Sequence, residues 1–357
     1  MDSITIRKPD DWHVHLRDRV MLEAVAPFTA CAFGRAIVMP NLSPNPATTT
    51  ADVLAYRERI QGALKAFPNF VPLMTYYLTD NSSAEEIANG FTNGIATAVK
   101  MYPAGATTNS AQGVTDIKNV YKVLEAMQKV GMPILLHGET LKYENGDTID
   151  PFDREKVFLD TTLPTLLKNF PELKIVLEHA TTKDAVDFVR SDTSKRLGST
   201  ITLHHLMENK MDVEHSSEPA YLHCMPVIKN EANQKTLREA ATSGDSHFFL
   251  GTDSAPHPVS AKEKIPPAAG IFTAPAALEM YAGVFEEEGK LENLEAFASL
   301  NGAKFYGLPP NEEKITLIKN PWTIDSEVHV SNGDTIRPFG YHEDPAKRLK
   351  IQWRIAH

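Results

Sequence analysis

Two histidines separated by one residue, His13 and His15, are the first side chains of this 357-residue sequence that could do chemistry. They lie in a strand-like apolar run, and side chains two residues apart on a strand point to the same side. Imidazole is the commonest metal ligand in proteins. The pair therefore favours a divalent metal site, although the same spacing also occurs among ordinary buried or surface histidines.

Three later apolar runs each end in another residue that can bind a metal. These residues are His137, His179 and Asp253. Core packing would prefer apolar side chains at such positions, because a buried polar group needs a partner. Together with His13 and His15, the three strand ends indicate a metal centre.

Lys100 closes a further apolar run, residues 95–99. A buried amine is unfavourable unless it is paired, neutralised or modified. One interpretation is a lysine that reaches solvent or pairs with a carboxylate such as Asp253 or Glu139. The other is a carboxylated lysine, in which the neutral amine has added carbon dioxide and the carbamate oxygens bridge two cations.

The elements that must position these residues alternate between short apolar runs and longer amphipathic segments. The expected strands are 11–16, 35–40, 70–78, 95–102, 133–137, 174–179, 200–205 and 248–252; helix-like segments between them include 51–67, 114–129, 154–169, 183–192 and 233–243. Crossovers of this length suit parallel strands. Eight such units predict an α/β fold, a (β/α)8 TIM-type barrel, with a doubly wound sheet as the alternative.

The C-terminal part of the chain is predicted to be an appendage to the barrel. We expect a barrel domain over residues 1–308, ending in helical segments 275–288 and 293–306, and a C-terminal extension over 309–357 packed on the barrel. The proline-containing segment 309–321 is the predicted linker, and 325–330 and 348–354 could pair as strands. Too little chain follows residue 308 for an independent core.

Composition excludes several classes of function. A formal net charge of -10 disfavours nonspecific attraction to nucleic acid or to an anionic membrane. No segment approaches the roughly 20 apolar residues of a membrane span. We therefore expect a cytoplasmic protein with neither a nucleic acid nor a membrane as partner, in which the two cysteines, Cys31 and Cys224, are buried and reduced.

Six short motifs resemble one family. They are His13-Val14-His15-Leu16-Arg17-Asp18, Met39-Pro40-Asn41, Lys100-Met101-Tyr102-Pro103, Leu136-His137-Gly138-Glu139, Glu178-His179 and Gly251-Thr252-Asp253-Ser254-Ala255-Pro256-His257. Over about residues 11–308 the sequence is similar to the short, single-chain bacterial-type (class II) dihydroorotases of the metal-dependent amidohydrolase superfamily. The His-Leu-Arg-Asp, Met-Pro-Asn and Thr-Asp-Ser-Ala-Pro-His motifs are specific to this branch.

The resemblance implies reversible cyclisation of N-carbamoyl-L-aspartate to L-dihydroorotate, in de novo pyrimidine synthesis, by a homodimeric enzyme. It implies two zinc ions per subunit, one held by His13, His15 and Asp253 and the second by His137 and His179, with carboxylated Lys100 (N6-carboxylysine) bridging them. Asp253 would also be the catalytic proton carrier.

The same resemblance implies a set of substrate contacts. Arg17, Asn41 and His257 would bind the substrate carboxylate, the backbone around Met225 and Ala269 would contact the ring, and Thr107 and Thr108 would reach the substrate from a mobile loop. For Arg17, the residue type and spacing support the same role. A guanidinium can pair with a carboxylate through two hydrogen bonds, and a strand that continued to Arg17 would point its side chain to the side of His13 and His15. The loop could equally be an ordinary flexible connection.

Two other functions stay open at this point. Another cyclic-amide hydrolase, such as a hydantoinase or an allantoinase, would share the metal ligands. A noncatalytic barrel that serves as a binding protein would share the fold. The remaining eight histidines, among them His204 and His205, have no comparable strand-end pattern and no expected function.

Overall fold

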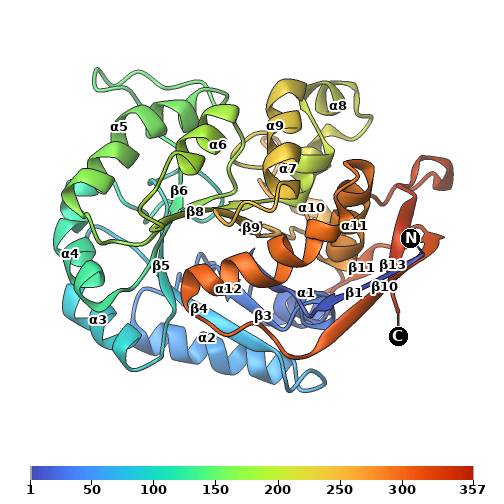
Figure 1. The fold of residues 1–357 in the computed structure, drawn as a ribbon, viewed down its shortest axis with the longest axis horizontal. Coiled ribbons are helices and arrows are strands. Elements are labelled where there is room, and N and C mark those ends of the chain that lie inside the picture. Colours follow the sequence, from blue (N-terminus) through green and yellow to red (C-terminus); the bar gives the residue numbers. More distant parts are fainter. Residues whose placement is uncertain (1, 357) are drawn as a thin grey trace.

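The eight predicted barrel strands form one parallel sheet in the computed structural model, which describes residues 2–356 (Figure 1). In sheet order the strands are β2 (Asp10–Val14), β3 (Arg35–Val38), β4 (Val71–Tyr77), β5 (Ala98–Met101), β6 (Ile134–His137), β7 (Ile175–Glu178), β8 (Leu197–Ile201) and β9 (Phe248–Leu250). The sheet closes where the segment after β9 meets β2, because Asp253 N donates to His13 O at 2.8 Å and His15 N donates to Ser254 O at 3.0 Å. The predicted (β/α)8 barrel is confirmed.

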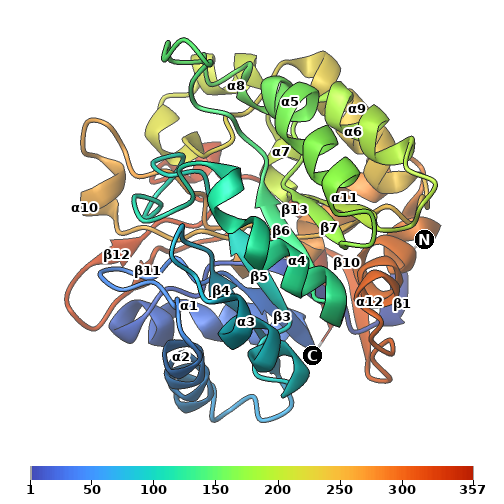
Figure 2. The same cartoon turned by 90° about the vertical axis from the view of Figure 1, so that its left-hand side faces the viewer.

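Helices surround the strands, as Figures 1 and 2 show. The longer ones are α1 (Arg19–Ala32), α2 (Thr50–Ala63), α3 (Ala84–Thr92), α4 (Tyr121–Val130), α5 (Arg154–Asn169), α6 (Lys183–Arg190), α9 (Glu231–Thr242) and α11 (Ala277–Glu287), and the six-residue helix α12 (Asn301–Tyr306) lies near the C-terminal end of the barrel domain's sequence. Several begin at a side chain that caps the free N–H groups of the first turn. Thr49 and Asp52 form a capping box on α2, and Thr182 caps α6.

Shorter helical segments lie in the connections. They are α7 (Leu203–Met207), α8 (Lys210–His215), α10 (Val259–Lys262), the turns η1 (Ile117–Val120), η2 (Pro219–Leu222), η3 (Ala274–Ala276), η4 (Leu291–Asn293) and η6 (Pro345–Lys347), and the π-helical turn η5 (Ala296–Leu300). The predicted strand 200–205 is wrong in its second half, since the strand ends at Ile201 and α7 begins at Leu203. A short apolar run does not by itself distinguish a strand from a buried helix.

Side chains fill the barrel interior at its amino-terminal end, which is opposite the carboxyl ends of the strands where His137 and His179 lie. Trp12, which precedes His13 on β2, stacks on Tyr306 of α12 with ring centroids 4.6 Å apart. Phe249 of β9 packs edge-on against Trp12. Helix α12 therefore fills the amino-terminal end of the barrel and leaves the carboxyl end for a site, as is usual in such barrels.

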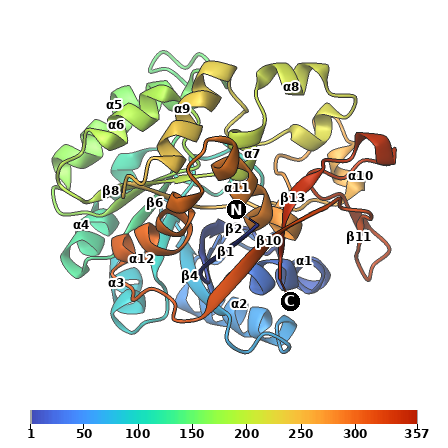
Figure 3. The same cartoon turned by 45° about the vertical axis from the view of Figure 1, so that its right-hand side comes forward.

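A small antiparallel sheet joins the two ends of the chain. Its order is β1 (Ser3–Arg7), β10 (Lys314–Trp322) and β13 (Ile351–Ile355), and Figure 3 shows β1 beside β10. The predicted linker 309–321 is thus wrong, because most of it is strand β10. Segments 325–330 and 348–354 do not pair with each other: β11 (Val328–His329) pairs with β12 (Thr335–Ile336), and β13 pairs with β10. The predicted division of the chain at residue 308 stays a prediction.

The two cysteines differ in environment. Cys224 is buried and free, as expected, but Cys31 is free and exposed on α1, so its predicted burial is wrong. An apolar sequence neighbourhood does not determine which face of a helix a residue occupies. Within residues 2–356, no helix combines the length and the apolar character that crossing a membrane would require.

Candidate active site

One pocket at the carboxyl ends of the barrel strands collects the predicted site residues. All of them line it except Lys100 and His257. Lys100 lies just behind the wall, with its Nζ 5.1 Å from the ring centroid of Tyr102, a pocket residue. His257 touches the wall through Arg17 and Ala269.

His13, His15 and Asp253 form the tightest cluster in the pocket. The Nε2 atoms of His13 and His15 lie 3.4 Å and 3.1 Å from the same carboxylate oxygen, Oδ1 of Asp253. All three residues are buried, and they offer one ligand atom each within 4.8 Å of one another. Two imidazoles and a carboxylate in this arrangement can hold a divalent metal ion.

Glu178 orients His13 and was not predicted from the sequence. Its Oε2 lies 2.7 Å from His13 Nδ1 and accepts a hydrogen bond from Thr200 Oγ1 at 2.6 Å. The second ring nitrogen of His13 is thereby directed at Asp253, which is the usual arrangement for a metal-binding histidine. A carboxylate at the end of an otherwise apolar strand, next to His179, is the sequence signal that could have identified it.

His137 and His179 lie side by side on the next part of the wall, with ring centroids 4.6 Å apart. Glu139 Oε2 lies 2.7 Å from His137 Nε2, and this pairing was also missed in the sequence. Nδ1 of His179 is buried and has no hydrogen-bond partner among the described residues. Burial, with the neighbouring charges of His137 and Lys100, holds the pKa of His179 well below its ordinary value. The imidazole is therefore neutral, as a metal ligand must be.

Lys100 is fully buried, with 0% of its surface exposed. Its Nζ has no hydrogen-bond partner in the part of the chain that the structure describes, so it neither reaches solvent nor pairs with Asp253 or Glu139. Burial lowers its pKa to about 8, although Glu178 and Asp253 act in the opposite direction. An unpaired amine that is partly neutral near physiological pH is the nucleophile that carbamate formation requires, and a carbamate would supply the anionic oxygens that this neutral histidine pair lacks.

Three residues of the site adopt left-handed backbone conformations. The φ angles are 58° at Arg17, 42° at His179 and 43° at Asp253. Such angles are unfavourable for residues other than glycine, and they concentrate at functional sites. The chain turns at His179 directly after β7 and at Asp253 three residues after the end of β9, and both side chains line the pocket.

The Asp253 carboxyl is ionised at neutral pH. Burial alone would raise its pKa, but electrostatic interaction with the imidazoles of His13, His15 and His179, together with the hydrogen bond from His15, holds the pKa well below its ordinary value. An ionised carboxylate beside a metal site can accept a proton from a nearby water.

Arg17 reaches the pocket by a route that strand alternation does not predict. Strand β2 ends at Val14, and the backbone at Arg17 is left-handed, yet the side chain of Arg17 lines the pocket. Its Nε donates to Pro256 O at 2.8 Å, and its Nη2 lies 2.9 Å from His257 Nε2. Burial lowers the pKa of Arg17 to about 10, so the side chain remains a cation at neutral pH.

The loop that carries Thr107 and Thr108 lies across the pocket. Thr108 Oγ1 donates to Ala269 O at 3.2 Å, and Asn41 Nδ2 donates to Thr108 O at 3.1 Å. His257 Nε2 lies 2.9 Å from the same Ala269 oxygen. The loop, Asn41 and the Ala269 segment thus form one continuous wall of the pocket.

His204 and His205 have structural surroundings that the sequence did not suggest. Both are buried in α7, close to Cys224. Both ring nitrogens of His205 have partners, Thr202 Oγ1 at 2.6 Å and Pro226 O at 3.1 Å. His205 therefore holds the main chain next to Met225 in place.

Comparison with known proteins identifies close relatives. The amidohydrolase family model matches residues 10–324. A dihydroorotase of Erwinia tasmaniensis is 52% identical over 338 residues, which cover 94% of this chain and 95% of that protein. The crystal structure of dihydroorotase from Saccharomyces cerevisiae in complex with 5-fluoroorotic acid is 33% identical, with a TM-score of 0.90 and coverage of 100% and 99% of the two chains.

A hydantoinase is a more distant match. The L-hydantoinase of Arthrobacter aurescens is 18% identical, with a TM-score of 0.77 and coverage of 98% of this chain and 82% of that one. At this level of identity the likeness shows a shared fold only. The hydantoinase alternative is thus less well supported than the dihydroorotase assignment.

Proposed function

The chain belongs to the amidohydrolase family and, within it, to the dihydroorotases, and from this premise we propose how its site binds two zinc ions and its substrate. The reaction interconverts N-carbamoyl-L-aspartate and L-dihydroorotate by forming or breaking one cyclic amide bond. The proposal assigns the metal ligands, the proton carrier and the substrate contacts.

The metal ligands are the strand-end residues. His13, His15 and Asp253 would hold one zinc ion, His137 and His179 would hold the other, and Lys100, carboxylated on Nζ, would be a ligand shared by both. The observation that carries this assignment is the fully buried amine of Lys100, which lacks a hydrogen-bond partner among the described residues. When bound, two such cations lower the pKa of a water molecule and polarise the amide carbonyl.

Asp253 is the proposed proton carrier. In the hydrolytic direction its carboxylate takes a proton from the attacking water and gives it to the ring nitrogen as the C–N bond breaks. In the direction of ring closure the same proton moves in reverse. The position of Asp253 supports this role, because its Oδ1 lies 3.4 Å and 3.1 Å from the Nε2 atoms of His13 and His15, within the proposed metal site.

The proposed substrate contacts line the same pocket as the metal ligands, apart from His257, which contacts Arg17 and Ala269. Arg17, Asn41 and His257 bind the carboxylate that does not react, and main-chain groups of Met225 and Ala269 contact the ring. Thr107 and Thr108 close over the substrate. The relative from Saccharomyces cerevisiae supports this part of the proposal, since it binds 5-fluoroorotic acid, a pyrimidine that carries a carboxylate.

We also propose that the protein is a homodimer and acts in the cytoplasm. Both follow from the family resemblance. Sedimentation of the purified protein at several concentrations tests the first, and a mass near twice 39.5 kDa is expected.

The decisive experiment combines metal analysis with a substrate comparison. The purified protein should contain about two zinc ions per chain, and its native mass spectrum should show the added mass of a carboxyl group on Lys100. It should open the ring of L-dihydroorotate faster than the rings of hydantoin and allantoin. Faster opening of hydantoin or allantoin would overturn the substrate assignment. A protein with neither zinc nor turnover would instead favour a noncatalytic binding protein.

A further inference from the structure

Lys262 is a buried lysine that the proposed chemistry does not use. It ends α10, and only 3% of its surface is exposed. Its Nζ donates to three main-chain carbonyls: His223 O at 3.0 Å, Ala268 O at 3.0 Å and Gly270 O at 2.8 Å. An ammonium has three N–H donors, so every one of them is occupied.

The three acceptors belong to the two backbone segments that face the substrate. Ala268 and Gly270 flank Ala269, and His223 lies two residues before Met225. A direct main-chain hydrogen bond from Gly270 N to His223 O, 3.0 Å long, connects the same segments. The ammonium therefore sits at the junction that sets the separation between Met225 and Ala269.

Segment 268–270 is also held by its main chain, since Ala268 N donates to Ala261 O at 3.1 Å. Gly270 has a φ of 148°, and a Cβ on it would lie 2.5 Å from Ala255 O. Ala269 itself presents its carbonyl to Thr108 and His257 on the pocket side. The carbonyls on either side of it point away from the pocket, toward Lys262.

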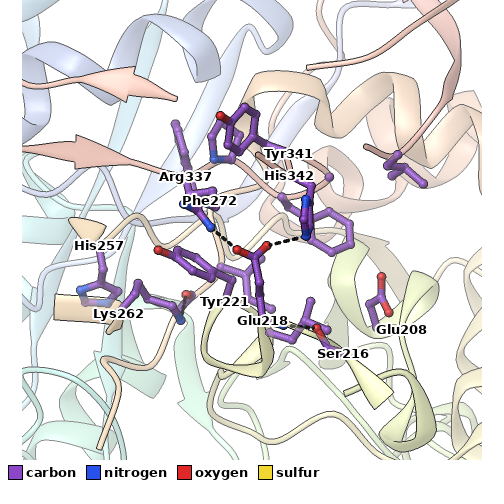
Figure 4. A pocket seen from close by; sticks show the side chains of 17 residues that line it. Glu208, Ser216, Glu218, Tyr221, His257, Lys262, Phe272, Arg337, Tyr341 and His342 are labelled. Carbon is purple, nitrogen blue, oxygen red and sulfur yellow. Dashed lines mark hydrogen bonds and ion pairs between the residues drawn. The ribbon is translucent and has the colours of Figure 1, made fainter. Parts of the chain in front are cut away.

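A surface role or an ion pair does not explain Lys262. Figure 4 shows it in the wall of a cavity of about 160 Å³ that adjoins the active site, near His257 and Tyr221. The acidic Glu218 in that cavity is paired with Arg337 and His342. Within residues 2–356, no carboxylate lies within 4.0 Å of the Lys262 amine, so carbonyl dipoles alone offset its charge.

Filling this space with an apolar side chain would avoid the cost of burying a charge. Burial lowers the pKa of Lys262 to about 8, which shows that its surroundings disfavour the ammonium. A buried charge is retained at such a cost where it fixes a particular arrangement of its partners. Here those partners are the carbonyls beside Met225 and Ala269.

We propose that Lys262 is a positioning residue for the pyrimidine ring: its ammonium clamps segments 223–225 and 268–270 so that the main-chain groups of Met225 and Ala269 meet the substrate. The inference rests on the proposed function, because it takes the ring contacts from there. Lys262 does not touch the metal ligands, and it acts on binding of the ring and not on the proton transfer.

The test is Lys262→Met in the zinc-loaded enzyme, with Lys264→Met as the matched control. Methionine keeps most of the packing volume but has no N–H donor. We expect KM for L-dihydroorotate to rise at least about tenfold, with kcat changed less than about threefold and zinc content unchanged. Lys264 is exposed, and its variant should behave as wild type.

A rescue experiment separates positioning from a purely structural role. Lys262→Ala leaves a hole that borders the cavity of Figure 4, and added propylammonium, which matches the removed group, should lower its KM toward the wild-type value. Propan-1-ol is of similar size but uncharged, and it should not. The comparison of the two additives on Lys262→Ala also tests the proposal if the Lys262→Met variant does not fold.

The outcomes distinguish the two proposals. A wild-type enzyme that does not open L-dihydroorotate would overturn the proposed function. In an active enzyme, a wild-type KM in Lys262→Met would overturn the role of Lys262 alone. Loss of zinc or of kcat without a rise in KM, or equal rescue by both additives, would also overturn it.

Discussion

Arg17→Met and Arg17→Lys test how the site binds the substrate carboxylate. A guanidinium has five N–H donors. In this structure Nε is used by Pro256 O and one N–H of Nη2 is directed at His257, so Nη1 and the other N–H of Nη2 remain for the substrate. Nη1 and Nη2 of the guanidinium can together make two parallel hydrogen bonds to a carboxylate.

The magnitude follows from these two bonds. Each hydrogen bond to a charged group contributes roughly 1.5–3 kcal/mol. Loss of both in Arg17→Met should lower kcat/KM by about two to four orders of magnitude, at about 1.4 kcal/mol per tenfold change. Arg17→Lys keeps the charge and loses one bond, so a decrease of about one to two orders is expected. Most of the change should be in KM, because the carboxylate does not react.

The assay measures initial rates of L-dihydroorotate opening together with zinc content. Arg19→Met is the matched control, because Arg19 shares the left-handed backbone conformation of Arg17 but is exposed. The control and both Arg17 variants should retain zinc. The reasoning is refuted if Arg17→Met keeps a KM within about threefold of wild type, or if its defect is loss of metal.

Three further changes have defined outcomes. Asp253→Ala should lower kcat by at least about two orders of magnitude, the scale of a general acid/base contribution, and near-wild-type turnover would contradict the role of Asp253. Glu178→Gln should weaken zinc binding about 10- to 100-fold, measured by competition with a chelator, because it loosens His13; unchanged affinity would contradict this. Glu279 is buried in α11, and burial raises its pKa to about 7 from 4.5 in the unfolded chain. Because the folded protein favours protonated Glu279, the contribution of this residue to stability is largest below about pH 4.5 and falls as pH rises to about 7. Relative to Glu279→Gln, urea unfolding should show the wild type losing about 3 kcal/mol over this range, at about 1.4 kcal/mol per pKa unit; a pH-independent difference would be inconsistent with a buried, protonated Glu279.

The barrel and the metal-binding cluster could be predicted because their signals are local. Each barrel strand is an apolar run, and His137, His179 and Asp253 follow such runs directly. Parallel strands bring their carboxyl ends to one face, so residues far apart in sequence meet without any need to know the helices in detail.

What could not be predicted depends on contacts between distant segments. Strand β10 reads as a linker because its partners β1 and β13 come from opposite ends of the chain. Lys262 reads as one charged residue in an exposed loop, since nothing in the sequence indicates that its amine meets three carbonyls. The direction of Arg17 was predicted on the condition that the strand before it continues, but the strand ends at Val14, the backbone turns at Arg17, and the side chain still lines the pocket.

The pairing of β1 with β10 has a consequence for synthesis of the protein. Residues 3–7 leave the ribosome before their partners at 314–318, which follow about 300 residues later. During this interval β1 is an unpaired edge, which other chains could use as a template. The barrel can begin to assemble while β1 waits, since domains fold as the chain emerges. We therefore expect chains truncated before β10 to aggregate through their N-terminal segment, even where the barrel strands are complete.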